Sequence, residues 1–193
     1  MIENLIDIYN LKEEKRTGWE LRKVTDPETV ADHSWGTAFL SLIYADQEDL
    51  NQDKAVKMAL IHDLGEAEIG DIPYRKAGEK RNAEEKQRKE ESAMKTFGKN
   101  LDSKEVVRLW EEYEEKQTVV AKFVKDMDII DLCLTALKYE KGNRYNPDED
   151  NENFREYENM DEFFATTQER LSTKTGKELF TDIKARYQQA KKE

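Results

Sequence analysis

The sequence predicts an all-α fold, a compact multi-helix bundle formed by one domain over residues 1–193. Apolar residues recur at the 3.6-residue period of a helix along most of the chain, and the alternating pattern of strands is almost absent. Charged residues make up 39% of the chain, which holds only 8 glycines and 3 prolines, a composition typical of long helices with much exposed surface. The length suits one domain with its own core, and no repeat or linker divides it.

Capping and breaking residues bound the predicted helices. In order, these helices cover residues 2–13, about 29–44, 53–64, 82–97, 103–116, about 118–140, 160–172 and 176–191. Thr29 and Asp32, three residues apart, form a weak capping box at the second helix, although Pro27 also suits its first turn. Asp53 is a favourable N-cap for the third helix, and Gly65 is a favourable C-cap.

The stretches between these helices are predicted to be irregular. Residues 16–26 contain Gly18 and stop at a proline, and residues 66–80 contain two glycines and a proline. Residues 141–153 are polar and read as a loop.

The helix of residues 118–140 is the most apolar in the chain, so we expect it to form the centre of the core. Trp35 and Trp110 are expected in the core or between helices. Cys133 lies in the central helix and is expected to serve packing. As the only cysteine it excludes an internal disulfide, which fits the reduced cytoplasm.

The charge balance limits the partners of the protein. Lys and Arg number 32 and Asp and Glu number 43, which gives a net charge of −11. Such a chain repels nucleic acid polymers and anionic membrane surfaces, and no apolar run is long enough to span a bilayer. The first four residues also lack the features of a signal peptide. A small anionic substrate remains possible if a metal ion or an arginine cluster attracts it.

The two histidines lie on faces that are predicted to point inward. His62 shares a helix face with apolar residues of the third predicted helix, and Asp63 points about 100° further round, so the pair can flank one ion. His33 shares its face with Val30, Thr37 and Leu40. With only two histidines, a His-rich two-metal centre is excluded. For either histidine alone, a hydrogen-bonded core residue is the commoner interpretation.

The central helix also carries acids that need partners. By periodicity Asp131 falls inside the apolar stripe, which includes Leu134, while Asp128 lies on its edge and Asp126 faces away. A buried carboxylate without a partner is costly, so Asp128 and Asp131 should meet a metal, an arginine or a helix terminus. Periodicity alone leaves these three partners open.

These residues resemble a known family. His33, His62-Asp63 and Asp128 match the H…HD…D pattern of the HD-domain metal-dependent phosphohydrolases. Longer motifs, spread in order over roughly residues 1–140, resemble the 5′-deoxynucleotidase branch of that family. They are Arg16-Thr-Gly-Trp19-x-x-Arg22, Pro27-Glu28-x-Val30-x-Asp32-His33, His62-Asp63-x-x-Glu66, Gly70-Asp71-Ile72-Pro73, Leu109-Trp110-Glu111-Glu112-Tyr113 and Phe123-Val124-Lys125-x-x-Asp128.

The resemblance implies an HD-domain bundle with one divalent metal ion. Its metal-site core would cover about residues 16–140, with the helices of residues 160–191 packed on it. The implied ligands are His33, His62, Asp63 and Asp128, while Asp131 is left as a supporting or structural acid. Two imidazoles and two carboxylates suit Co²⁺, Mn²⁺, Fe²⁺, Ni²⁺ or Zn²⁺, with open positions for water and substrate.

The resemblance also implies roles for residues around the ion. Glu66 would be the acid–base carboxylate, and Asp71 would position the attacking water. The segment with Arg16, Trp19 and Arg22 would recognise phosphate and sugar, with the Trp selecting against a 2′-hydroxyl. Gly18 stands where some members carry an arginine, so Arg16 or Arg22 would bind the phosphate. Lys76 also lies within possible reach, although a solvated lysine is the commoner interpretation.

The expected activity is hydrolysis of deoxyribonucleoside 5′-monophosphates by a cytoplasmic enzyme, and the resemblance makes a homodimer plausible. One alternative is an HD hydrolase of another small phosphorylated metabolite. The alarmone hydrolases carry Glu-Asp where this chain has Glu66-Ala67, which argues against that branch. The other alternative is a non-catalytic, metal-stabilised nucleotide-binding module. A purely structural site would not need Glu66 and Asp71, which argues against this reading.

Overall fold

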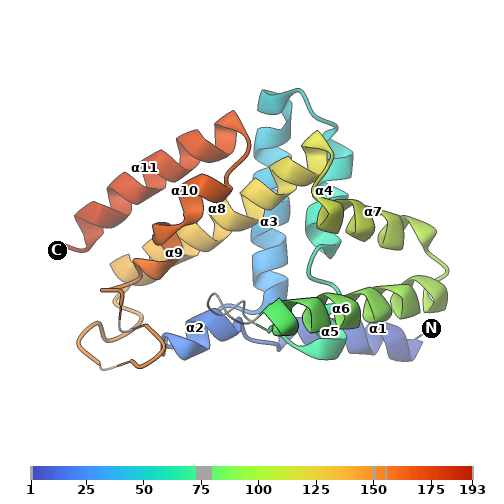
Figure 1. Ribbon diagram of the computed structural model, residues 1–193, viewed down its shortest axis with the longest axis horizontal. Coiled ribbons are helices and arrows are strands. Elements are labelled where there is room, and N and C mark those ends of the chain that lie inside the picture. The colour runs from blue at the N-terminus through green and yellow to red at the C-terminus, as the bar shows by residue number, and fades with distance from the viewer. Residues whose placement is uncertain (1, 73–79, 150, 155, 193) are drawn as a thin grey trace.

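The computed structural model describes residues 2–72, 80–149, 151–154 and 156–192, and its regular secondary structure is helical. In this part of the chain, β-type pairing is limited to one bridge between Lys15 and Thr29. Two long helices, α3 (Val30–Tyr44) and α8 (Val119–Lys141), cross near the middle of the molecule, and the others pack around them (Figure 1). The predicted all-α class is confirmed.

Most predicted helices are present with shifted ends. The other α-helices are α1 (Ile2–Tyr9), α2 (Thr17–Leu21), α4 (Gln52–Ile61), α5 (Glu66–Ile69), α6 (Lys80–Asn100), α7 (Lys104–Glu115), α9 (Glu162–Ala165), α10 (Thr167–Arg170) and α11 (Lys174–Ala190). Short 3₁₀ turns, η1 (Asn10–Lys12) and η2 (Ala45–Glu48), follow α1 and α3. The predicted capping box between Thr29 and Asp32 begins α3.

α2 lies inside the stretch that was predicted to be a loop. It forms in spite of Gly18 because tertiary contacts hold both its start and its centre. The Asp71 carboxylate accepts a hydrogen bond from the Thr17 backbone N–H at 2.8 Å, which satisfies one of the free donors of the first turn. Trp19 at the centre of the helix is fully buried. These long-range contacts leave no signal in the local sequence.

The third predicted helix starts and ends differently from the prediction. Asn51, not Asp53, caps α4, because its side chain accepts a hydrogen bond from the Lys54 backbone N–H at 2.9 Å. α4 ends at Ile61, and the next residues form turns that lead into the short α5. The predicted irregular stretch therefore begins with a helical turn. The predicted C-terminal helix of residues 160–172 is also divided, into α9 and α10.

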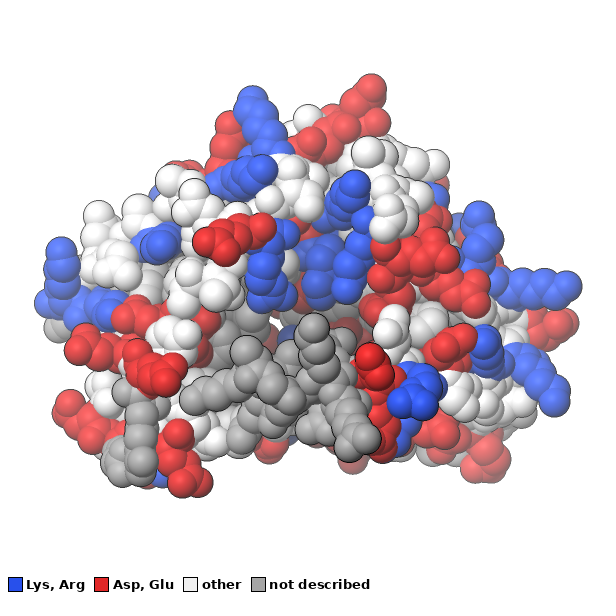
Figure 2. All heavy atoms as spheres, in the orientation of Figure 1, with Lys and Arg blue, Asp and Glu red and all other residues white. Residues whose placement is uncertain are grey.

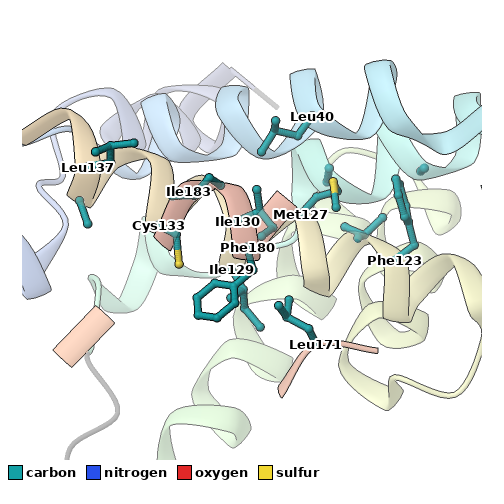
Figure 3. Close-up of a cluster of buried hydrophobic side chains, with 14 of the residues drawn as sticks. Leu40, Phe123, Met127, Ile129, Ile130, Cys133, Leu137, Leu171, Phe180 and Ile183 are labelled. Carbon is teal, nitrogen blue, oxygen red and sulfur yellow. The ribbon is translucent and has the colours of Figure 1, made fainter. Parts of the chain in front are cut away.

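α8 is the centre of the core, as predicted. It packs against α3, α4 and α7 and also against α9 and α11. Phe123, Met127, Ile130 and Cys133 are fully buried along it, and side chains of α3 and α11 meet them (Figure 3). Burial raises the pKa of the Cys133 thiol to about 12, which agrees with a packing role.

Two residues of α8 were placed on the wrong face by periodicity. Asp126 was predicted to face away from the core but is fully buried. Its carboxylate accepts hydrogen bonds from the backbone N–H groups of Ser172 and Thr173 and from the Thr173 hydroxyl, at 2.7 to 3.0 Å. Leu134, assigned to the inward stripe, is 37% exposed. A one-sided helix pattern fails here because α8 is covered on more than one side.

The surface carries both charged and apolar groups. Basic and acidic side chains are interspersed over the face shown in Figure 2. Trp35 was expected to be a core or interface residue, yet it is 68% exposed and stacks on Phe39 with ring centroids 5.4 Å apart. Trp110 is buried, in agreement with its prediction. Among the described helices, none has the length and apolar composition needed to cross a membrane.

Candidate metal centre

Four side chains from three segments converge at one point. His33 comes from α3, His62 and Asp63 from the turn after α4, and Asp128 from the middle of α8. The two Nε2 atoms of the histidines are 3.3 Å apart. Asp128 Oδ1 lies 3.2 Å from His33 Nε2, and Asp63 Oδ2 lies 3.2 Å from His62 Nε2. The structure therefore brings together the four side chains that the sequence suggested as ligands.

The other ring nitrogen of each histidine is held by an acceptor. His62 Nδ1 lies 2.7 Å from the carbonyl oxygen of Ala59, and His33 Nδ1 lies 2.7 Å from Asp131 Oδ2. A carbonyl or a carboxylate oxygen accepts hydrogen bonds, so both Nδ1 atoms carry protons and both Nε2 atoms can offer lone pairs to an ion. Nitrogen and carboxylate oxygen donors of this kind suit a divalent transition metal. The donor set present therefore fits one such ion.

The local field at this point favours positive charge. Burial and the Arg16 guanidinium lower the pKa of His33, but Asp128 and Asp131 outweigh them and raise it to about 10. Burial alone would raise the pKa of Asp63, yet His62, Arg16 and His33 hold it well below its usual range. The site thus combines ionised carboxylates with a strong preference for a cation. A metal ion that binds there displaces protons from its ligands.

Asp131 contacts His33 at the candidate metal centre, and a glycine makes room for its carboxylate. A Cβ atom added to Gly36, three residues after His33 on α3, would lie 2.0 Å from Asp131 Oδ1. We therefore expect Gly36→Ala to displace the Asp131 carboxylate and release His33 Nδ1. The affinity for the metal should fall by about 10- to 100-fold, the usual effect of losing the partner of a metal-bound histidine.

Calorimetric metal titration of Gly36→Ala measures this loss. Gly18→Ala is the matched control, since its added Cβ would meet its nearest neighbour only at 3.9 Å. Unchanged metal affinity in Gly36→Ala would contradict the supporting role of Asp131.

Arg16, Glu66 and Asp71 border the same centre. An Arg16 guanidinium nitrogen lies 3.1 Å from Asp63 Oδ2 and 4.0 Å from Glu66 Oε2. Glu66 is only 3% exposed. Burial and the charges of Asp63 and Asp71 raise its pKa to about 9, in spite of nearby cations, which favours the protonated carboxyl. Asp71 accepts hydrogen bonds from Thr17 at both its carboxylate and its carbonyl oxygen.

Trp19 differs from its predicted role in sugar recognition. The indole is fully buried between Tyr139 and Phe163, with ring centroids 5.1 and 4.2 Å away. Its Nε1–H donates a hydrogen bond to Glu28 Oε1 at 2.9 Å. In this conformation Trp19 packs α2 onto α8 and does not offer its ring to a ligand.

Of the two arginines that are candidates for phosphate binding, only Arg16 lies beside the four converging side chains. Arg22 is buried against Glu162, with Nε 3.1 Å from Oε1, and its guanidinium lies over the rings of Tyr145 and Phe154. Arg22 is thus engaged away from the four converging side chains, whereas Arg16 lies beside them. Lys76 lies outside the described residues.

The structure adds supporting residues that the sequence reasoning missed. Tyr113 and Lys125 both donate to Asp128 Oδ2, at 2.7 and 2.6 Å, which leaves Oδ1 facing His33. Lys86 donates to Glu66 Oε1 at 3.0 Å. Lys125 stands three residues before Asp128, so helical spacing offered a signal for it. Tyr113 and Lys86 reach the site from α7 and α6, and their spacing gives no such signal.

Curated proteins with similar sequences carry nucleotidase names. The chain is 42% identical to a Bos taurus protein named 5′-deoxynucleotidase HDDC2 over 136 residues, which are 69% of this chain and 64% of that protein. It is 32% identical to 5′-deoxynucleotidase hdd1 of Schizosaccharomyces pombe over 151 residues, 74% of this chain and 73% of that protein. The match thus spans slightly less than two thirds of the length of the bovine relative.

Solved structures and a family model agree with these matches. The PH0347 protein of Pyrococcus horikoshii OT3 superimposes with a TM-score of 0.73 and 30% identity, covering 97% of this chain and 99% of that one. A conserved hypothetical protein of Pyrococcus furiosus gives a TM-score of 0.73 and 28% identity, covering 96% of this chain and 99% of that one. The family model described as the HD domain matches residues 8–172. The chain belongs to the HD domain family.

Proposed function

We propose that the protein is a metal-dependent phosphohydrolase, a 5′-deoxynucleotidase that converts deoxyribonucleoside 5′-monophosphates to deoxyribonucleosides and phosphate. The observation that carries this proposal is the convergence of His33, His62, Asp63 and Asp128 beside a buried Glu66. Relatives that match most of this chain are named for this reaction, which supports the choice of substrate.

The proposal assigns one divalent ion to these four ligands. Co²⁺, Mn²⁺, Fe²⁺, Ni²⁺ and Zn²⁺ all suit a set of two imidazoles and two carboxylates. Such an ion polarises a phosphoryl oxygen and lowers the pKa of bound water. Asp128 would bind through Oδ1, because Tyr113 and Lys125 engage its other oxygen.

Arg16, Glu66 and Asp71 have separate tasks in the proposed reaction. The Arg16 guanidinium binds phosphoryl oxygens and neutralises their charge, a task that its planar donors suit. The water oxygen bonds to phosphorus while the bond from phosphorus to the 5′-oxygen breaks. Glu66 gives its proton to that departing oxygen, and its raised pKa keeps the proton available. Asp71 accepts a hydrogen bond from the attacking water and so orients it, and the proton that the water loses stays on the released phosphate.

The buried position of Trp19 changes how its contribution is understood. Because the indole makes no open contact, we expect Trp19 to act through α2, which carries the neighbouring Arg16. Selectivity for deoxyribose would then depend on the shape that α2 gives to the site.

A panel of 5′-mononucleotides with a metal series tests the proposed function. We expect phosphate release from deoxyribonucleotides with Co²⁺ or Mn²⁺, none with a chelator in excess, and slower release from ribonucleotides. Phosphate assays over the panel, with the purified full chain, give the rates. Absence of release from every nucleotide in the presence of metal would contradict the proposal.

The same panel separates the two alternatives. Release only from other phosphate monoesters would indicate a hydrolase of another small phosphorylated metabolite. Binding of nucleotides without turnover would indicate a non-catalytic nucleotide-binding module.

We also propose a domain organisation, a location and an oligomeric state. Residues 1–193 would form one HD domain that works in the cytoplasm as a homodimer. In support of a dimer, α3 exposes an apolar stripe formed by Trp35, Phe39, Leu42 and Ile43. These positions follow helical spacing, so they share one face of α3, and a second copy could cover them. The mass of the protein in solution, measured by sedimentation equilibrium, tests this state.

A further inference from the structure

Lys86 is a buried cation at an unusual place. It lies on α6 at the spacing of Ala93, Met94 and Phe97, which are all buried, so it occupies the inward face of a helix that is otherwise highly charged. Lys86 is itself only 7% exposed. A lysine at such a position needs partners for its charge.

The partners of Lys86 border the metal centre. Its Nζ donates to Glu66 Oε1 at 3.0 Å and to the Ile72 carbonyl oxygen at 2.9 Å, and Glu90 Oε1 lies 3.4 Å away. These acceptors, among the described residues, surround an ammonium group that carries three donors. Burial lowers the pKa of Lys86, but Glu66 and Glu90 outweigh burial and raise it above its usual value, so the group is charged.

Close packing of α6 against the turn before α5 makes this contact possible. A Cβ atom added to Gly65 would lie 3.4 Å from the backbone Cα of Glu90, an ordinary van der Waals distance, so α6 and this turn are in direct contact. Glu66 follows directly in the chain. Lys86, one turn before Glu90 on α6, then reaches Glu66 from the inner face of the helix.

The contact leaves the two oxygens of Glu66 in different situations. Oε1 is bound by Lys86, whereas Oε2 is buried and has no hydrogen-bond partner among the described residues. Oε2 lies 4.0 Å from an Arg16 guanidinium nitrogen, on the side where the proposed reaction places the phosphate. Ile72, the other residue that Lys86 holds, directly follows Asp71.

We infer that Lys86 is a positioning residue, which fixes Glu66 through Oε1 and the Asp71–Ile72 segment through the Ile72 carbonyl, so that Glu66 Oε2 remains free to face the reacting group. This inference rests on the proposed function for its catalytic meaning. The hydrogen bonds from Lys86 to Glu66 Oε1 and to the Ile72 carbonyl oxygen are independent of that function.

The kinetic test compares Lys86→Met, Lys86→Arg and the control Lys89→Met. Lys89 lies on the same helix, is exposed and pairs with Glu85 at 2.9 Å. With the deoxynucleotide that the wild type cleaves fastest, we expect Lys86→Met to lower kcat by about 100-fold, as a misplaced catalytic group does. KM and metal content should change little. Lys86→Arg should restore part of kcat, and Lys89→Met should match the wild type.

A double variant distinguishes a positioning role of Lys86 from a purely structural role. If Lys86 acts through Glu66, Lys86→Met should lower kcat little further in a Glu66→Gln background, because residues that act as a unit are not additive. An undiminished additional loss in that background, or a loss of bound metal in Lys86→Met, would overturn the inference. If Lys86→Met does not fold, Lys86→Gln serves the same comparison.

A second measurement needs no enzymatic activity. Urea unfolding of the wild type, Lys86→Gln, Glu66→Gln and the double variant gives the coupling free energy between the two side chains. We expect the two single losses to sum to clearly more than the loss in the double variant. Additive losses would overturn the inference whatever the activity. A wild type that releases no phosphate but shows this coupling would overturn the proposed function and support the contact between Lys86 and Glu66.

Discussion

Asp128→Ala should abolish both metal binding and phosphate release, whereas Glu66→Gln should abolish phosphate release alone. Asp128 Oδ1 faces His33 Nε2 at 3.2 Å, so its removal takes one of the four donors from the ion. Glu66 Oε2 instead lies 4.0 Å from an Arg16 guanidinium nitrogen, and its Oε1 accepts a hydrogen bond from Lys86. A glutamine there keeps the shape of the side chain but has no carboxyl proton to give. We expect kcat to fall by roughly 10²- to 10⁴-fold, the usual contribution of a general acid.

Metal content after dialysis, measured by inductively coupled plasma mass spectrometry, distinguishes the two variants. Glu66→Gln should retain wild-type metal content, and Asp128→Ala should retain almost none. Asp182→Ala is the control, since it removes an exposed acid of α11 that touches none of the four converging side chains. Loss of metal from Glu66→Gln would show that this carboxylate binds the ion, contrary to the acid role. Full metal occupancy in Asp128→Ala would remove Asp128 from the ligands.

Asp126→Ala should cause the largest loss of stability among the substitutions considered. The carboxylate of Asp126 binds the backbone N–H groups of Ser172 and Thr173 just before α11. Alanine would take the acceptor from these part-buried backbone donors, and each such loss costs about 1–3 kcal/mol. We therefore expect the free energy of unfolding to fall by about 3 kcal/mol. The melting temperature should fall by roughly 6–12 °C for a domain of this size.

Urea unfolding followed by circular dichroism measures the effect of Asp126→Ala. Asp182→Ala is the matched control, because Asp182 is an exposed acid on α11 and its loss should change the free energy by less than about 0.5 kcal/mol. Equal stability of Asp126→Ala and Asp182→Ala would mean that the buried carboxylate contributes nothing net to the attachment of α11.

The sequence predicted the four converging side chains of the candidate metal centre better than the residues around them. His33, His62, Asp63 and Asp128 were found because ligand identity and helical spacing leave a signal in the chain, and the family pattern repeats that signal. Asp128 needed the family pattern in addition, since periodicity placed it only at the edge of the apolar stripe. Its distinction from Asp131 is visible in the structure, where Asp131 contacts the far nitrogen of His33.

Residues that depend on contacts between distant segments were harder to predict. Asp126 was assigned to the outer face because a helical pattern assumes one buried side, whereas α11 covers the other side of α8. The Trp35 ring is hydrophobic but exposed, and hydrophobicity alone could not distinguish a buried ring from an exposed one. α2 was missed because its stability comes from the buried Trp19 and from Asp71, not from local propensity.

The hydrogen bonds between Thr17 and Asp71 tie the start of α2 to the segment that follows α5, although the two are far apart in the chain. Arg16 directly precedes Thr17, so the guanidinium beside Asp63 and the carboxylate proposed to orient water are both linked to the hydrogen bonds between Thr17 and Asp71. A shift of either segment is passed to the other through these hydrogen bonds. In the proposed reaction, the position of the Arg16 guanidinium and the position of the Asp71 carboxylate would therefore change together and not independently.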